Sequence, residues 1–326
     1  MLKKKCPYFG KCGGCVWQDL EPREYILKKE SFIRRSFQDV GLTIQLAPMI
    51  LISTGTRRRA SFAFFKSHFG FNEMKSHQIV DIEKCPLLTP NINNIISSLK
   101  KITTQLQSQG DCFVLDTPLG LDIHIKDKKG SPTLPQLELL TSLNQEPTIA
   151  RVIYNNVPIF EKTPLSGTAD SFSQPSLEGE QKLIELILNN IGNSKHAVDL
   201  FCGKGTFTLP LLEQGLHVIG YDNSESVLAL GTHGEQRDLF RNPLIPEELK
   251  GIDLAVMDPP RAGALAQTQN LAETDIPLII MVSCNPQTAA RDIKILVDNG
   301  WNLEQIIPID QFTYSNHIEL VSILRK

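Results

Sequence analysis

The spacing of apolar and polar residues changes near the middle of the chain, and this change predicts two domains. In the first part, residues 21–40 repeat at helical spacing. Tyr25 and Phe37 belong to the apolar positions, and Lys29 is one of the basic residues between them. Gly41 follows as a usual C-terminal stop. We therefore expect an amphipathic helix with its lysines and arginines on the polar face.

Short β-rich runs follow this helix. SFAFF and HFGF within residues 57–80 predict a hairpin, residues 91–107 predict a short helix, and CFVLDT, LDIHIK and ARVIYN predict further strands. Residues 162–176, KTPLSGTADSFSQPS, are rich in Gly, Pro and Ser and mark a boundary. We place a smaller β-rich domain at residues 1–165 and a second domain at residues 166–326.

The second domain alternates predicted strands and helices. Its predicted strands are HAVDLF, HVIGYD, DLAVMD, PLIIMVS and HIELVSILR, and its predicted helices are residues 183–191, GTFTLPLLEQG and AARDIKILVDNG. Such alternation is typical of an α/β fold with a parallel, doubly wound, Rossmann-like sheet.

Composition narrows the class of protein. The chain has 326 residues, of which 41% are hydrophobic and 21% charged, and its net charge is −3. A net negative charge gives no overall electrostatic attraction for nucleic acid, so RNA contacts would come from local runs of basic residues. These runs are Lys3–Lys5, Arg34–Arg35 and Arg57–Arg59, although a solvated surface is the ordinary meaning of such runs.

Targeting signals are absent from the sequence pattern. The N-terminal lysines lead to Cys6 without an apolar stretch, and no apolar run approaches the ~18 residues of a membrane span. Seven cysteines in a chain of this size argue against a disulfide scaffold. We therefore expect a cytoplasmic protein without a membrane partner, and the pattern implies no obligate protein partner.

Four cysteines have the spacing of metal ligands. Cys6, Cys12 and Cys15 form C-x5-C-x2-C, and Cys85 lies far downstream. A close triplet with one distant partner suits a [4Fe–4S] cluster. Zinc sites more often combine two C-x2-C pairs, so zinc is the second interpretation and unliganded thiols are the third.

The run DLFCGKG, from Asp199 to Gly205, follows the first strand of the second domain and leads into a helix. Its two glycines allow a sharp turn and close approach of a ligand. Asp222 ends the next strand, 17 residues after Gly205, where a carboxylate can accept hydrogen bonds from ribose hydroxyls. These features predict an adenosine-bearing cofactor but leave open a nicotinamide dinucleotide, S-adenosylmethionine or a mere tight turn.

Chemistry-bearing residues follow two later strands. Asp258 opens the run DPPR, and Cys284 lies in the run SCNP. Both are predicted at carboxyl ends of parallel strands, where open α/β sheets form their sites. A cysteine just before a helix can favour the thiolate, although a buried structural cysteine is also common there. Glu319, in the last strand, is a candidate base or a surface residue.

Several motifs together resemble the bacterial uridine C5-methyltransferases of 23S ribosomal RNA that contain a [4Fe–4S] cluster. They are the four cysteines, RRRA, DLFCGKGTFTLPL, DPPRAG, SCNPQTAARD and HIE, and they extend from Cys6 to Glu319. The resemblance implies a methyltransferase domain and an iron–sulfur domain that helps hold RNA. It also implies that the helix at 20–41 packs on the methyltransferase domain.

The resemblance assigns roles to individual residues. Cys284 would add to C6 of uracil as the nucleophile, Glu319 would remove the C5 proton, and Asp258 would orient the pyrimidine or the cofactor. Cys112 and Cys202 match no chemical role and are expected to be structural. The residues expected to bind S-adenosylmethionine are Gln174, Phe201, Thr206, Asp222, Asp238 and Asp258.

The sequence also departs from this family. Larger members carry an N-terminal β-barrel that binds RNA, whereas five residues precede Cys6. Asp238 follows Asp222 after a shorter segment than usual, and the loop before Glu319 lacks the usual Phe-Pro-His. We expect an RNA uridine C5-methyltransferase acting on 23S ribosomal RNA. The alternatives are a transfer-RNA enzyme of the same chemistry and a non-catalytic RNA-binding or assembly factor.

Overall fold

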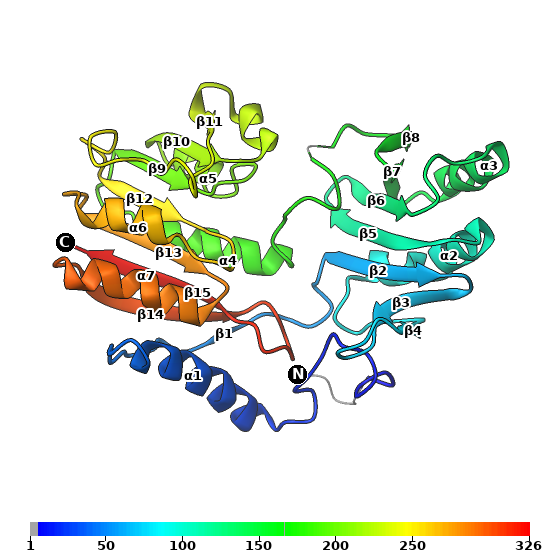
Figure 1. The fold of residues 1–326 in the computed structure, drawn as a ribbon, viewed down its shortest axis with the longest axis horizontal. Helices are drawn as coiled ribbons and strands as arrows, with labels where there is room; N and C mark the ends of the chain where they lie inside the picture. Colours follow the sequence, from blue (N-terminus) through cyan, green and yellow to red (C-terminus); the bar gives the residue numbers. More distant parts are fainter. Residues whose placement is uncertain (1–5, 166) are drawn as a thin grey trace. The chain divides into compact units, whose positions relative to one another are not determined.

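The computed structural model describes residues 6–165 and 167–326, which form two compact units (Figure 1). The first unit comprises the described residues up to Asp19 together with Ser53–Glu178 and Thr313–Ser315. The second comprises Leu20–Ile52, Gly179–Phe312 and Asn316–Lys326. The first unit thus extends past the boundary expected at residue 165. The lysine run at residues 3–5 lies outside the described residues.

A seven-stranded sheet forms the first unit, in the order β4-β3-β2-β5-β6-β7-β8. All neighbours are antiparallel except β6 and β7. The strands are β2 (Arg59–Phe65), β3 (His68–Asn72), β4 (Ile79–Asp81), β5 (Gln109–Thr117), β6 (Gly120–Asp127), β7 (Ile149–Tyr154) and β8 (Val157–Glu161). The helices are α2 (Pro90–Leu106), α3 (Leu134–Thr141) and the 3-10 helix η1 (Ser142–Gln145).

The predicted hairpin of β2 and β3 is confirmed. The chain turns at Lys66, whose φ is +54°, and Phe62 packs on Phe69 and Phe71 with ring centroids 4.9 and 5.0 Å apart. Helix α2 buries its apolar stripe in the same hydrophobic core. Gln107 caps its C-terminus with a backbone in the left-handed conformation. Alternation in the strands and helical spacing in α2 therefore direct the same unit's apolar side chains into one core.

The second unit contains an eight-stranded sheet in the order β1-β14-β15-β13-β12-β9-β10-β11. The strands are β1 (Ile50–Leu51), β9 (His196–Leu200), β10 (His217–Asp222), β11 (Gly234–Gln236), β12 (Leu254–Met257), β13 (Leu278–Ser283), β14 (Asn302–Asp310) and β15 (Glu319–Arg325). The helices are α1 (Pro22–Gln38), α4 (Leu177–Leu188, whose first two residues belong to the first unit), α5 (Thr208–Glu213), the 3-10 helix η2 (Glu225–His233), α6 (Leu265–Ala272) and α7 (Pro286–Asp298).

The expectation of a wholly parallel sheet is wrong at one end. Strand β15 runs antiparallel to both β13 and β14. Strand β14 was not expected, because its first residues are exposed and Pro308 interrupts the pattern of a central strand. The last two strands, β14 and β15, thus form an antiparallel pair, and β15 lies between β13 and β14.

Helix α1 belongs to the second unit, although it comes before most of the first unit in the sequence. It packs beside α7 (Figure 1) and buries Tyr25, Ile33 and Phe37 completely. Lys29 is also buried, at 1% exposure, so its expected place on the polar face is wrong. Among residues 6–165 and 167–326, no helix combines the length and apolar character that a membrane span requires.

Candidate functional site

Cys284 and Glu319 are brought together by the pairing of β13 with β15. Ser283, the last residue of β13, pairs with Leu320, so Cys284 and Glu319 occupy the adjoining positions at the same edge. Burial, followed by the charges of Glu319 and Asp258, raises the pKa of the half-buried Cys284 thiol to about 12, and the charge of Arg261 opposes this shift. The expected nucleophile and base therefore lie within electrostatic reach of one another.

The Glu319 carboxyl group is almost completely buried, at 2% exposure. Its Oε2 accepts a hydrogen bond from Gln311 Nε2 at 2.7 Å, whereas its Oε1 has no hydrogen-bond partner within the described residues. Burial raises the pKa of Glu319 to about 7, and the Gln311 bond opposes the shift. A carboxyl group with such a pKa and an uncommitted oxygen can accept a proton near neutral pH.

The segment from Asp258 to Arg261 follows β12 and is anchored on both sides. Asp258 N donates to the carbonyl of Leu200 at 3.1 Å, which fixes the start of the segment beside β9. The carbonyl of Arg261 accepts bonds from Asn285 Nδ2 at 3.0 Å and Thr288 Oγ1 at 3.2 Å. The segment is thereby held next to the one that carries Cys284, as expected for two neighbouring strand ends.

The predicted cofactor turn adopts the backbone that its glycines allow. Gly203 and Gly205 have φ values of +57° and +90°, and Phe201 has φ +64°. Gly203 N donates to Asp222 Oδ2 at 2.9 Å, and Ser224 N donates to Oδ1 at 2.7 Å. A Cβ atom on Gly203 would meet nothing within 4 Å, so the turn leaves its backbone accessible. An open glycine turn beside a carboxylate at a strand end fits an adenosine-bearing cofactor.

Asp199, which the sequence showed only as the start of this motif, is fully buried. Its Oδ2 accepts a bond from Thr208 Oγ1 at 2.6 Å, and no partner for Oδ1 exists in the part of the chain that is described. Burial raises the pKa of Asp199 to about 7, and the charge of Asp222 adds to the effect. An acidic residue within the apolar run of β9 was the available signal for this site.

The other expected cofactor residues have diverse settings. Thr206 is half-buried in the turn. Asp238 caps a turn through bonds from the backbone N–H groups of Phe240 and Arg241, at 3.0 and 3.3 Å, and Phe240 lies 5.4 Å from Phe201 between ring centroids. Gln174 belongs to the first unit, where its carbonyl accepts a bond from Arg58 Nε at 3.1 Å.

This last bond corrects the expectation for Arg58, the middle residue of the arginine triplet. Arg58 is only 9% exposed, and its backbone N–H donates to Pro175 at 2.8 Å. Arg59 Nη2 donates to the carbonyl of Asp170 at 3.2 Å, and Arg57 Nε donates to the carbonyl of Arg59 at 3.1 Å. Arg58 therefore fixes the segment around Gln174 within its own unit. Because Arg58 is buried, the prediction that it contacts an RNA phosphate is wrong.

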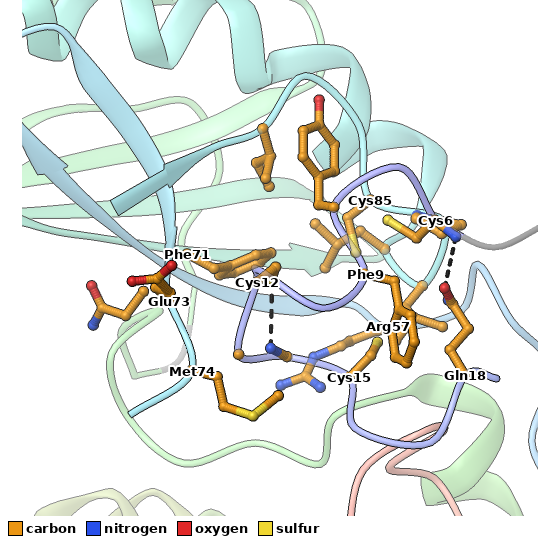
Figure 2. A pocket seen from close by; sticks show the side chains of 18 of the residues that line it. Cys6, Phe9, Cys12, Cys15, Gln18, Arg57, Phe71, Glu73, Met74 and Cys85 are labelled. Carbon is orange, nitrogen blue, oxygen red and sulfur yellow. Dashed lines mark hydrogen bonds between the residues drawn. The ribbon is translucent and has the colours of Figure 1, made fainter. Parts of the chain in front are cut away.

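The four expected metal ligands line one cavity of about 400 Å³ in the first unit (Figure 2). Cys6 N donates to Gln18 Oε1 at 2.6 Å, and Gly14 N donates to the sulfur of Cys12 at 3.5 Å. Cys85 N donates to Asn93 Oδ1 at 2.8 Å. The close triplet and the distant cysteine thus face a common space, which the fold assembles from a loop and the segment after β4.

The cysteines in this cavity influence one another's pKa values. Burial raises the pKa of Cys15 to about 12; Cys85, Cys12 and Cys6 add to the shift, and Arg57 opposes it. Burial likewise raises the pKa of Cys85. Within the residues that the structure describes, no group of three or more His, Cys, Asp or Glu is placed to hold a metal ion. Cys6, Cys12, Cys15 and Cys85 thus share a cavity, but the described residues form no ready-made metal site.

The two remaining cysteines are packed in the cores. Cys112 lies in β5 at 0% exposure, and Cys202 is 5% exposed beside the cofactor turn. Burial raises the pKa of both thiols. These settings agree with the structural roles expected for them.

Known proteins resemble the chain over nearly its whole length. A family described as tRNA (Uracil-5-)-methyltransferase matches residues 232–326. An uncharacterized RNA methyltransferase of Agrobacterium fabrum is 36% identical over 344 residues, which cover 97% of this chain and 83% of the relative. The 23S rRNA (uracil(1939)-C(5))-methyltransferase RlmD of Vibrio parahaemolyticus is 26% identical, over 98% of this chain and 81% of its own.

A solved structure shares the fold. It is the tRNA (uracil-54, C5)-methyltransferase of Pyrococcus abyssi in complex with S-adenosyl-L-homocysteine, with a TM-score of 0.72 and 21% identity over 99% of this chain and 88% of that one. The two-unit architecture is thus that of a known methyltransferase. The sequence relatives show that the chain belongs to the family of S-adenosylmethionine-dependent RNA (uracil-C5)-methyltransferases.

Proposed function

We propose that the protein transfers a methyl group from S-adenosylmethionine to C5 of a uridine in 23S ribosomal RNA, in the cytoplasm, through a covalent bond between Cys284 and the base. The observation that carries this proposal is the adjacency of Cys284 and Glu319 across β13 and β15. The similarity to the Vibrio parahaemolyticus enzyme supports the class of RNA.

The two residues have complementary tasks. Cys284 sulfur adds to C6 of uracil, and the electron pair of the C5–C6 double bond moves to give an enolate that is nucleophilic at C5. S-adenosylmethionine, when bound, supplies the methyl group that C5 takes up. Glu319 then removes the C5 proton, the C5–C6 double bond returns, and the bond from C6 to Cys284 breaks. The raised pKa of Glu319 suits it to take that proton near neutral pH.

The chain's own residues would hold the methyl donor at the edge formed by β9 and β10. The open turn at Gly203 and the Asp222 carboxylate would receive the adenosine moiety, and the accessible backbone of the turn supports this role. Phe201 and Thr206 lie in the same turn. Asp258, at the next strand end, would orient the pyrimidine or the donor. Gln174 and Asp238 remain proposed contacts on the strength of the resemblance alone.

A [4Fe–4S] cluster held by Cys6, Cys12, Cys15 and Cys85 is part of the proposal. Four thiols in a cavity of about 400 Å³ would repel one another once ionised, so a cationic group favours their ionisation together. The spacing of one close triplet and one distant cysteine supports this cluster over a zinc ion, because zinc sites more often combine two C-x2-C pairs. When bound, the cluster would fix the cysteine loop to the sheet.

Transfer RNA is the alternative substrate, because the matching family is described by transfer-RNA activity. Incubation with labelled S-adenosylmethionine and either 23S ribosomal RNA fragments or transfer RNA, followed by mapping of the modified base, separates the two. 5-Methyluridine in the ribosomal fragment supports the proposal. Label only in transfer RNA would identify transfer RNA as the substrate. If the protein does not bind S-adenosylmethionine, a non-catalytic RNA-binding factor is favoured.

Cys284→Ala tests the covalent step. We expect kcat for RNA methylation to fall by about 10³-fold or more, because the enolate cannot form without the thiolate. Affinity for S-adenosylmethionine, measured by calorimetry, should stay near that of the wild type. Methylation at an undiminished rate would remove Cys284 from the chemistry.

Glu319→Gln tests the electrostatic coupling in the absence of RNA. Above pH 7 the ionised Glu319 raises the pKa of Cys284, so its removal should lower that pKa and increase the thiolate fraction. We expect alkylation of Cys284 by iodoacetamide at pH 8.5 to accelerate about two- to tenfold, as a pKa change of up to one unit produces. Below pH 6 the ratio should approach unity, since Glu319 is then protonated in the wild type.

Peptide mass spectrometry distinguishes Cys284 from the other cysteines in this assay. Glu304→Gln, an exposed glutamate on β14, is the matched control and should leave the rate unchanged. Equal rates for Glu319→Gln and the wild type at pH 8.5 would contradict the coupling.

Cys85→Ser tests the ligand set. In protein purified anaerobically, we expect bound iron to be lost and the first unit to unfold at lower temperature, because one of four thiolate ligands is missing. Iron content and visible absorption are the measurements. Cys112→Ala retains all four cavity cysteines and should retain iron, and an unchanged iron content in Cys85→Ser would rule out the four-ligand assignment.

A further inference from the structure

We propose that Lys29, a buried lysine of helix α1, is a positioning residue for Glu319. It joins both ends of the loop at residues 311–318 and so fixes the orientation of the carboxyl group that follows. This inference rests on the proposed function of Glu319 as the base. It adds a role for a helix that lies almost 300 residues before that glutamate in the chain.

The ammonium group of Lys29 has three partners inside the second unit. It forms an ion pair with Asp310 Oδ1 and donates to the carbonyl oxygens of His317 at 2.7 Å and Phe312 at 3.3 Å. Tyr25, one turn earlier on α1, donates its hydroxyl to Asp310 Oδ2 at 2.5 Å. An ammonium group has three donors, so these contacts occupy all of them and leave none for RNA.

The three acceptors lie at the two ends of the loop at residues 311–318. Asp310 ends β14, Phe312 lies two residues later, and His317 lies two residues before Glu319. Gln311 stands between the first two, and its Nε2 holds Glu319 Oε2 at 2.7 Å. Lys29 thus fixes the backbone on both sides of the residue that orients Glu319, and also the segment that leads into it.

A purely packing role does not explain a lysine at this position. The neighbouring buried positions of α1 carry Ile33 and Phe37, which fill the same core without an ion pair. Lys29 is 1% exposed, and burial of an ammonium group is unfavourable unless it is paired and fully hydrogen-bonded. The bonds of Lys29 fix the distance between the two ends of the loop at residues 311–318, which an apolar side chain cannot do.

Lys29→Met removes the three bonds and keeps most of the side-chain volume. Ile33→Ala, on the same face of α1, is the control for loss of packing, and the exposed Lys28→Met is the control for loss of charge. The first readout is the decay of the denaturation-resistant protein–RNA adduct under single-turnover conditions. We expect Lys29→Met to release methylated RNA about tenfold or more slowly, with KM for S-adenosylmethionine within about twofold of wild type.

The second readout needs no RNA. Alkylation of Cys284 at pH 8.5 reports the charge of Glu319, so Lys29→Met should shift its rate toward that of Glu319→Gln while Ile33→Ala does not. If the wild type neither methylates RNA nor forms an adduct, the proposed function fails. The alkylation result then still decides whether Lys29 places the carboxyl group.

Two results would overturn the inference. One is a Lys29→Met protein that melts earlier, as Ile33→Ala does, yet releases product and alkylates at wild-type rates, because Lys29 would then be merely structural. If Lys29→Met does not fold, Tyr25→Phe removes one bond from Asp310 and should slow product release in the same direction. Wild-type release by Tyr25→Phe in that case is the other overturning result.

Discussion

The register between β13 and β15 is the constraint on which the candidate active site depends. Ser283 opposite Leu320 sets Cys284 beside Glu319 at one edge of the sheet. Because strand side chains alternate between faces, a shift of one residue would carry the carboxyl group to the other face. All seven residues of β15 except Arg325 are buried, so the core resists such a shift. The hydrophobic effect thus determines the geometry of the proposed reaction.

The rest of the second unit supports this pair. The turn at Gly203 and the Asp222 carboxylate lie at the carboxyl ends of β9 and β10, and Asp258 follows β12. Parallel strands deliver these groups to the edge that also carries Cys284. The reversal of β15 is what allows its first residue, rather than its last, to reach that edge.

The first unit has its own hydrophobic core. Its sheet and the helix α2 build a core without the second unit's strands, and the cysteine loop faces a cavity at residues Cys6, Cys12, Cys15 and Cys85. Buried thiolates close to one another are unfavourable because their charges repel, and a bound cationic cluster would offset this repulsion. The proposed cluster, when bound, would therefore stabilise this unit.

Local patterns predicted much of this structure. Helical spacing predicted α1, alternation predicted the β2–β3 hairpin, and strand-end motifs predicted the positions of Asp258 and Cys284, because each depends on short-range periodicity. The direction of β15 and the burial of Lys29 could not be predicted in this way. Both depend on partners distant in sequence: β13 and β14 in the first case, and Asp310 in the second.

Charge alone was also misleading for Arg58 in the arginine triplet. A run of three arginines resembles an RNA contact, but Arg58 is buried and satisfies backbone carbonyls around Gln174. Strand β14 was missed because Pro308 and an exposed first half conceal its role. In each case tertiary packing, which sequence spacing does not encode, decided the outcome.

The most direct test of the account is a covalent trap. RNA carrying 5-fluorouridine at the target position has no C5 proton for Glu319 to remove, so the adduct cannot be released after methyl transfer. With S-adenosylmethionine present, the account predicts a stable protein–RNA complex whose cross-link maps to Cys284 by mass spectrometry. Methylation of the normal RNA without any trapped complex, or a cross-link at another residue, would contradict it.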